Sequence, residues 1–231
     1  MIRLTRVGHG GSADRVHVFI HGLNGDPLET WGAAEARGAF IHRLAGALGG
    51  RAFTAEHPSS LAAYAFDPQQ TIASVATGLA EAMAGVVSGA QRIDVIGHCF
   101  GGVLASQALV TLWRESPVGR EWLARADLRV VFLDSPQLLP GNPSPWLARL
   151  LSVVGAEPAA LRANVEWLLR ERPSPCLALR SQEEPWIDDC APFACAAPED
   201  RATLALPHTA LSRCPLEGAF APLDLTANWL R

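Results

Sequence analysis

Residues 92–113 read RIDVIGHCFGGVLASQALVTLW and are the most informative segment of the chain. The first part, 92–97, is a run of apolar and β-branched residues that predicts a buried strand. The part from 101 to 113 is apolar on nearly every side and predicts a helix buried against a sheet. Between them stands G-H-C-F-G, so the chain turns sharply from strand to helix at Cys99. The glycines two positions before and after Cys99 suit such a turn, because a side chain there would collide with neighbouring backbone.

Short apolar runs and longer amphipathic runs alternate along the rest of the chain. Strands are expected at residues 16–21, 63–66, 92–97, 128–134, 175–181 and 202–206, and helices at 35–48, 70–88, 101–113 and 219–230. The alternation predicts an α/β fold with a mostly parallel central sheet flanked by helices. The segment 135–174 interrupts it, because it opens on the stretch SPQLLPGNPSP and continues into two short helices with apolar faces. We interpret residues 1–231 as one domain with a small helical cap insertion at 135–174, whose apolar faces either pack on the core or form a lid over an acyl pocket.

The composition argues against several classes of function. The 231 residues, almost half of them apolar, suffice for one sizeable core but not for two full domains. The net charge of −4 comes without a basic run, which argues against nucleic-acid binding. No stretch is long and apolar enough for a membrane span, and the polar N-terminus lacks the apolar region of a secretory signal. The five cysteines are odd in number and irregularly spaced, which predicts reduced thiols and a cytoplasmic location, and the many Ala, Gly and Arg residues without any Lys are typical of a GC-rich bacterial genome.

Cysteines and acids gather in one C-terminal stretch, where a metal site could be imagined. Cys190 and Cys195 stand near Asp188 and Asp189, and Cys214 follows. Their spacing matches none of the zinc-binding motifs. We therefore expect no metal and no cofactor.

The turn at Cys99 has a counterpart in a known family. It resembles the nucleophile elbow G-x-S-x-G of the α/β-hydrolase superfamily, with Cys99 where most members have serine. Residues 16–31, VHVFIHGLNGDPLETW, are similar to the His-Gly-Leu segment of the lipase-like serine esterase branch, which includes inositol deacylases. The resemblance follows the strand order along nearly the whole chain and is most specific at 16–31 and 92–109. It implies an α/β-hydrolase fold and an oxyanion hole formed by the backbone N–H groups of Leu23 and Phe100.

One histidine stands where this resemblance places the general base. His208 follows the last expected strand, within Pro207-His208-Thr209. The other six histidines, at positions 9, 17, 21, 42, 57 and 98, all precede Cys99 in the chain. His98, the neighbour of Cys99, is expected to point away from the nucleophile. We therefore expect His208 to be the base.

The acid of the triad has more than one candidate. Glu184, in the stretch SQEEPW after the strand at 175–181, resembles the aspartate of the family's G-x-x-D-P loop and is the first choice. Asp134 follows the preceding strand, where some lipases carry the acid, and is the alternative; Glu183 comes third. Each also has a plain structural interpretation, Asp134 as a turn residue and Glu184 as a solvated loop carboxylate.

The chemistry expected of Cys99, His208 and an acid begins with attack of a thiolate on a carbonyl. Residue 99 would lie at a helix N-terminus, where N–H groups favour negative charge. Attack forms a thioester, which amines and carbanions cleave more readily than water does. We expect a hydrolase of small-molecule carboxylic esters or thioesters; the alternatives are an acyltransferase or cyclase using the same thioester, and a catalytically inactive binding protein built on the fold.

Two further interpretations remain open at this point. A Gly-x-Cys-x-Gly string taken alone also fits an ordinary strand–helix turn with a buried thiol. A serine enzyme in which cysteine replaces the serine to trap an intermediate would show the same pattern. The sequence predicts neither the acyl-chain length of the substrate nor the oligomeric state.

Overall fold

One sheet organises the fold. The computed structural model describes residues 2–8, 10–32, 34–67, 69–136, 145–171, 173–182 and 196–231. Within these ranges the sheet has seven strands in the order β1-β3-β2-β4-β5-β6-β7. Strand β1 pairs antiparallel with β3, and every other neighbouring pair is parallel. The strands are β1 (Arg3–Val7), β2 (Arg15–Ile20), β3 (Arg51–Glu56), β4 (Arg92–His98), β5 (Asp127–Leu133), β6 (Cys176–Ser181) and β7 (Arg201–Leu204).

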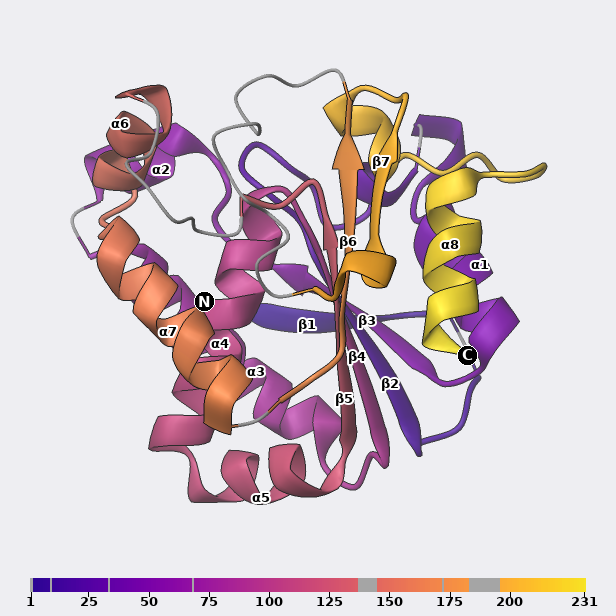
Figure 1. Ribbon diagram of the computed structural model, residues 1–231, viewed down its shortest axis with the longest axis horizontal. Coiled ribbons are helices and arrows are strands. Elements are labelled where there is room, and N and C mark those ends of the chain that lie inside the picture. Colours follow the sequence, from indigo (N-terminus) through magenta and orange to yellow (C-terminus); the bar gives the residue numbers. More distant parts are fainter. Residues whose placement is uncertain are drawn as a thin grey trace.

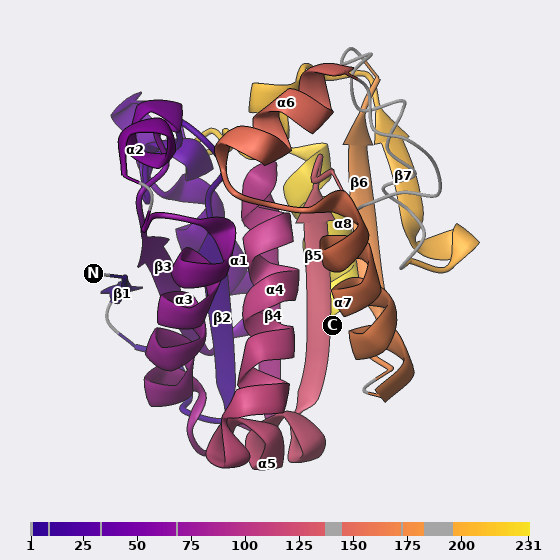
Figure 2. The same cartoon turned by 90° about the vertical axis from the view of Figure 1, so that its left-hand side faces the viewer.

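Helices cover both faces of the sheet. Helices α3, α4 and α7 lie on one face, whereas α1 and α8 lie on the other (Figure 1 and Figure 2). The arrangement is the mostly parallel, helix-flanked sheet that the sequence predicts. The helices are α1 (Ala39–Leu48), α2 (Leu61–Phe66), α3 (Ile72–Val87), α4 (Phe100–Glu115), α5 (Pro117–Arg125), α6 (Pro145–Val153), α7 (Pro158–Glu171) and α8 (Ala221–Leu230).

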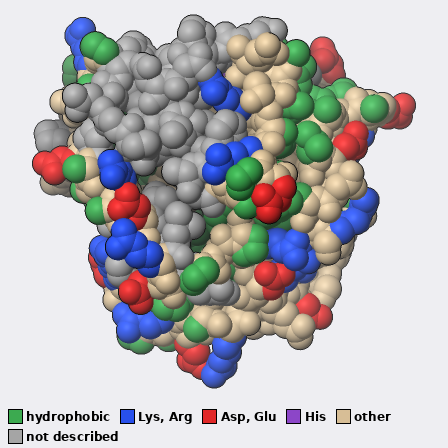
Figure 3. Space-filling model, in the orientation of Figure 1, with side chains coloured by type: hydrophobic (Ala, Val, Ile, Leu, Met, Phe, Trp, Pro, Cys, Tyr) green, Lys and Arg blue, Asp and Glu red, His purple; other side chains and the backbone are tan. Residues whose placement is uncertain are grey.

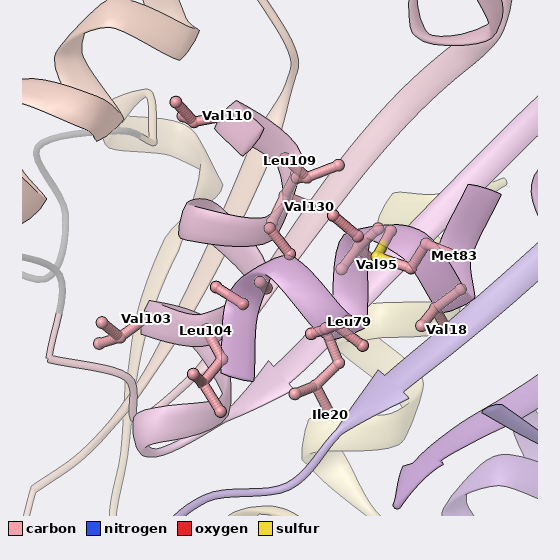
Figure 4. Close-up of a cluster of buried hydrophobic side chains, with 14 of the residues drawn as sticks. Val18, Ile20, Leu79, Met83, Val95, Val103, Leu104, Leu109, Val110 and Val130 are labelled. Carbon is pink, nitrogen blue, oxygen red and sulfur yellow. The ribbon is translucent and has the colours of Figure 1, made fainter. Parts of the chain in front are cut away.

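The central strands are buried on both faces, and their side chains alternate between two cores. In β2, Val18 and Ile20 belong to the core under α3 and α4, whereas Phe19 between them belongs to the core under α1 and α8. The period of two in a strand produces this alternation, and each such fully buried side chain stabilises the fold by about 1.5–3 kcal/mol. Figure 4 shows the first core, in which strand residues meet Leu79 and Met83 of α3. The two cores fix β4, and with it the position of the turn that follows.

The prediction of a strand at 63–66 is wrong. These residues belong to α2, which begins after Ser60, whose hydroxyl oxygen accepts the N–H of Ala63 at 3.1 Å. Of the six residues of α2, Tyr64 alone is buried, so the segment has no face that could enter a sheet. The strand in this part of the chain is instead β3, which precedes α2 and was not predicted. Its sequence RAFTAE shows no clear apolar pattern, although its four central residues are buried.

Two helices form where the sequence analysis expects them within 135–174. Helix α7 packs on α4, and α6 contacts α2. Leu151, Val154 and Leu161 from this segment are buried in the core shared with α3 and α4. This part of the segment therefore faces the core, as one of the two interpretations has it.

The surface carries interspersed charges. On the face drawn in Figure 3, acidic and basic side chains lie among apolar ones without a dominant patch of one sign. In the described part of the chain, every helix falls short of the length or apolarity that crossing a bilayer requires.

Candidate active site

Cys99 occupies the turn between β4 and α4. Its backbone has φ 53° and ψ −131°, a region that residues with a side chain rarely adopt. The turn is held by hydrogen bonds from the Cys99 N–H to the Leu133 carbonyl at 2.9 Å and from the Gly102 N–H to the Cys99 carbonyl at 3.1 Å. A Cβ on Gly97 would lie 2.5 Å from the Cα of Gly102, and one on Gly101 would collide with the Ile20 carbonyl. This strain and these close approaches are the elbow geometry that the G-H-C-F-G string predicts.

His208 reaches Cys99 from the far end of the chain. It opens the 3-10 turn His208–Leu211, which follows β7. Its ring donates a hydrogen bond through Nδ1 to Oδ2 of Asp134 at 2.7 Å, and the side chain of Cys99 lies near enough to the same ring to raise its pKa. The structure thus brings Cys99, His208 and Asp134 together at the carboxyl end of the sheet.

Asp134 is fixed on both of its carboxylate oxygens. It follows β5, is 1% exposed and adopts a positive φ of 48°. While Oδ2 accepts from His208, Oδ1 accepts the backbone N–H of Ser181 at 3.0 Å. A carboxylate bound in this way orients the imidazole and stabilises its protonated form.

Two neighbours, Asp134 and Cys99, raise the pKa of His208. Burial lowers the pKa of His208, but hydrogen bonds and negative charge from Asp134 and Cys99 outweigh burial and raise the pKa to about 10. The imidazolium is therefore the favoured form at neutral pH. It stands ready as a proton donor beside the sulfur atom.

His98, which the sequence analysis expects to point away from Cys99, lies beside His208. Its ring centroid is 4.8 Å from that of His208, and its Nε2 lies 3.2 Å from the His208 carbonyl oxygen, to which it donates when it carries the proton. Burial, followed by the charge of His208, lowers the pKa of His98 to about 3, so the ring is neutral. A neutral donor at this position anchors the backbone of His208. The expectation that His98 points away from Cys99 did not include this contact with His208.

The two residues expected to form the oxyanion hole lie on two different segments. Leu23 follows β2, and Phe100 is the first residue of α4, whose N–H has no partner within the helix. Gly22 lets the two segments approach, because a Cβ there would lie 2.6 Å from Cβ of Cys99. Leu23 and Cys99 line one cavity of about 150 Å³ together with His98 and His208.

A loop that the sequence analysis did not single out supports the segment containing Leu23. The ring of His57 stacks on that of His21 at 3.9 Å, and its Nε2 lies 3.1 Å from the His21 carbonyl oxygen. Ser59 accepts the N–H of Asn24 at 2.8 Å with its carbonyl and donates its hydroxyl to the Gly25 carbonyl at 2.9 Å. This loop follows β3, the strand that the sequence pattern did not reveal, so no signal in the sequence pointed to it.

Some of the residues that the sequence analysis considered lie outside the described ranges. Glu184 and Glu183 lie outside the described residues, as do Cys190 and Cys195. Cys214 is buried, and its sulfur accepts a hydrogen bond from Arg43 at 3.3 Å. Among the residues that can be described, none of the His, Cys, Asp and Glu side chains form a group of three able to hold a metal ion.

Comparison with known proteins places this geometry in context. The model of the alpha/beta hydrolase family matches residues 18–230. Among solved structures, a monoacylglycerol lipase from Paleococcus ferrophilus is similar, with a TM-score of 0.57, 16% identity, and coverage of 99% of this chain and 98% of that one. A lipase-esterase related protein from Clostridium acetobutylicum gives a TM-score of 0.55 at 12% identity, covering 100% and 98%. The carboxylesterase EstE1 from a metagenomic library gives 0.54 at 15% identity, covering 100% and 88%. No curated protein matches the sequence.

Proposed function

Because the chain belongs to the alpha/beta hydrolase family, we propose that it hydrolyses carboxylic esters or thioesters through an acyl group carried on Cys99. The observation that supports this most is the placement of the His208 ring, which contacts Cys99 on one side and Asp134 on the other. A nucleophile, a base and a group orienting the base are the parts that acyl transfer needs.

The first half of the reaction acylates the sulfur. The Cys99 thiolate attacks the carbonyl carbon, and the backbone N–H groups of Leu23 and Phe100 stabilise the negative oxygen that forms. The His208 imidazolium then gives its proton to the leaving oxygen or sulfur. An alcohol or thiol departs, and a thioester remains on Cys99.

The second half releases the acid. Neutral His208 takes a proton from water, the water oxygen bonds to the carbonyl carbon, and the bond from that carbon to Sγ of Cys99 breaks. The carboxylic acid leaves, and the thiolate and imidazolium are restored. Asp134 serves as the acid of the triad in this proposal, since it holds Nδ1 of His208 at 2.7 Å.

Acyl transfer to an amine or a carbanion is the second candidate. It is favoured by the cysteine itself, because the thioester on Cys99 reacts readily with such acceptors and slowly with water. The two candidates share every step up to the thioester and differ only in the group that removes the acyl chain.

The test uses a series of 4-nitrophenyl esters of increasing acyl length. Released nitrophenolate and the intact mass of the protein are followed together, for the wild type, Cys99→Ser, His208→Ala and, as a matched control, Cys176→Ala at a thiol buried elsewhere in the fold. Sustained turnover that is lost in His208→Ala and kept in Cys176→Ala supports hydrolysis. A single burst that leaves an acyl group on Cys99 supports a transferase, unless Cys99→Ser regains turnover, which points to a serine-type site. Absence of both release and adduct on every ester contradicts the proposal.

A further inference from the structure

The cavity beside Cys99 is small, and most of the residues that line it carry polar or charged side chains. It lies between the Leu23 segment and the turn that carries His208, and its volume is about 150 Å³. Its walls include the polar side chains of Asn24, Thr30 and Thr209. A short polar group finds hydrogen-bonding partners among these side chains.

The charged residues of the cavity differ in whether they have a counter-ion. Arg37 lies 3.6 Å from Asp26 and 3.8 Å from Glu29, so both acids on the Leu23 side have a cationic neighbour. Asp26 also accepts the N–H groups of Leu28 and Glu29 at 2.8 and 2.9 Å. The charge of each acid is thus partly balanced by Arg37, and Asp26 is also held by backbone N–H groups of the local turn.

Arg213 lines the cavity and has no counter-ion among the described residues. It follows the turn that carries His208. Its positive charge contributes to lowering the pKa of His98. Among the residues that line the cavity, Arg213 is the arginine whose charge is left for a ligand.

A second, independent observation lies next to it. Ser212 also lines the cavity and is 1% exposed, yet its buried hydroxyl has no hydrogen-bond partner among the described residues. A buried hydroxyl without a partner is destabilising, and a bound acceptor would remove that cost. A guanidinium and a hydroxyl on adjacent residues suit a carboxylate, because both donate hydrogen bonds to its oxygens.

We propose that Arg213 and Ser212 form an anion subsite that selects esters or thioesters whose acyl part is short and ends in a carboxylate. This inference rests on the proposed function, since it concerns the acyl group that Cys99 would receive. The acyl part is short in this proposal because the cavity beside Cys99 has a volume of only about 150 Å³. The carboxylate lies against Arg213, and the reacting carbonyl lies against Cys99.

Two esters of equal chain length test the proposal. Rates above the uncatalysed background are compared for 4-nitrophenyl hemiglutarate, which ends in a carboxylate, and 4-nitrophenyl pentanoate, which ends in a methyl group. The wild type is expected to have the larger kcat/KM for the hemiglutarate. Arg213→Gln should lower this preference by roughly tenfold, mainly through KM, and Ser212→Ala by a smaller factor. The preference should also weaken as salt is added.

The control variant is Arg125→Gln. Arg125 ends α5, at the edge of the sheet where β5 begins, and it pairs with Glu121 at 2.6 Å. Arg125→Gln changes the net charge by the same amount as Arg213→Gln. Because Arg125 lies at the amino end of the strands and Cys99 at the carboxyl end, this variant should leave the preference between the two esters unchanged. Equal rates on the two esters, a faster reaction of 4-nitrophenyl 4-aminobutanoate, or an equal loss on both esters in Arg213→Gln would overturn the subsite.

A measurement without turnover separates this inference from the proposed function. Alkylation of Cys99 is followed by peptide mass for iodoacetate, an anion, and for iodoacetamide, its neutral analogue. The ratio of the two rates should fall several-fold, roughly as a charge-assisted contact is lost, in Arg213→Gln but not in Arg125→Gln. An unchanged ratio overturns the subsite even if no ester is a substrate, whereas turnover of both esters without a preference overturns the subsite and leaves the proposed function intact.

Discussion

Two histidine–aspartate pairs lie at opposite ends of the same sheet. At the carboxyl end, Nδ1 of His208 is 2.7 Å from Oδ2 of Asp134; at the amino end, Nδ1 of His17 is 2.9 Å from Oδ2 of Asp94. The distances are nearly equal, but the surroundings differ. His208 lines a cavity and contacts a thiol, whereas the side chains of His17 and Asp94 are fully buried.

The second pair has no place for a substrate. Nε2 of His17 lies 2.6 Å from the Gly49 carbonyl oxygen, and Asp94 also binds Arg15 at 2.7 Å and Arg92 at 3.3 Å. The same arginines bind the Leu230 carbonyl at the end of α8, so this cluster fixes the C-terminal helix to the sheet. The comparison teaches that a histidine–aspartate pair becomes a candidate site only where a nucleophile and an open cavity adjoin it.

The largest expected effect is loss of activity in His208→Ala. Without the ring, Cys99 lacks both its proton acceptor and its proton donor, and kcat/KM should fall by about 10⁴-fold or more while the protein stays folded. The measurement is ester turnover together with circular dichroism. His17→Ala provides the matched variant, since any activity it loses should parallel its loss of folded protein. Equal specific activities of folded His208→Ala and wild type would contradict the assignment.

The next effect separates the candidate acids. Asp134→Asn keeps the shape of the side chain but removes the charge that supports the imidazolium, so kcat should fall by roughly 10²–10⁴-fold. Glu184→Gln should change kcat little. The reverse order of the two variants in a steady-state assay would make Glu184 the acid, as the sequence analysis first expected.

At the amino end the expected effect is on stability instead of rate. Asp94→Asn leaves the nearly buried arginines without their shared carboxylate, so the free energy of unfolding should fall by about 3 kcal/mol. Asp127→Asn is the control, because this carboxylate at the same edge is 48% exposed and its removal should cost less than about 1 kcal/mol. Urea unfolding measures both. A comparable loss in the two variants would mean that burial of the cluster contributes nothing.

The smallest effect concerns pH. The pKa of His208 is raised from 6.5 to about 10, so its contribution to stability is complete below pH 6.5 and is lost as pH rises through about 10. The pKa of His98 is lowered to about 3, so its ring should stay neutral from pH 5 to 8. Ring-proton NMR can follow both, with Cys99→Ala as the control in which the pKa of His208 should move back toward its ordinary value. Titration of wild-type His208 near pH 6.5 would contradict the electrostatic description.

Much of this arrangement can be read from local sequence, and some of it cannot. The strand–glycine–glycine–helix pattern around Cys99 predicts the elbow, because only small residues fit two positions away from it. The position of His208 after the last strand can likewise be predicted from nearby sequence. The acid cannot, because Glu184 and Asp134 both follow neighbouring strands and the sequence does not say which loop bends toward the imidazole. The sequence analysis did not identify His57 and Ser59 as part of the site. They follow β3, which is buried in the sheet but shows no periodic apolar pattern that would predict a strand.

The central claim is that Cys99 carries the acyl group. The most direct test mixes the protein with 4-nitrophenyl butyrate, quenches with acid during turnover and locates the adduct by peptide mass. The proposed mechanism predicts one butyryl group on the peptide containing Cys99, accumulating in His208→Ala only slowly if at all, and absent from Cys99→Ala. Turnover of the ester with no butyryl group on Cys99, or with the group on another residue in both variants, would contradict it.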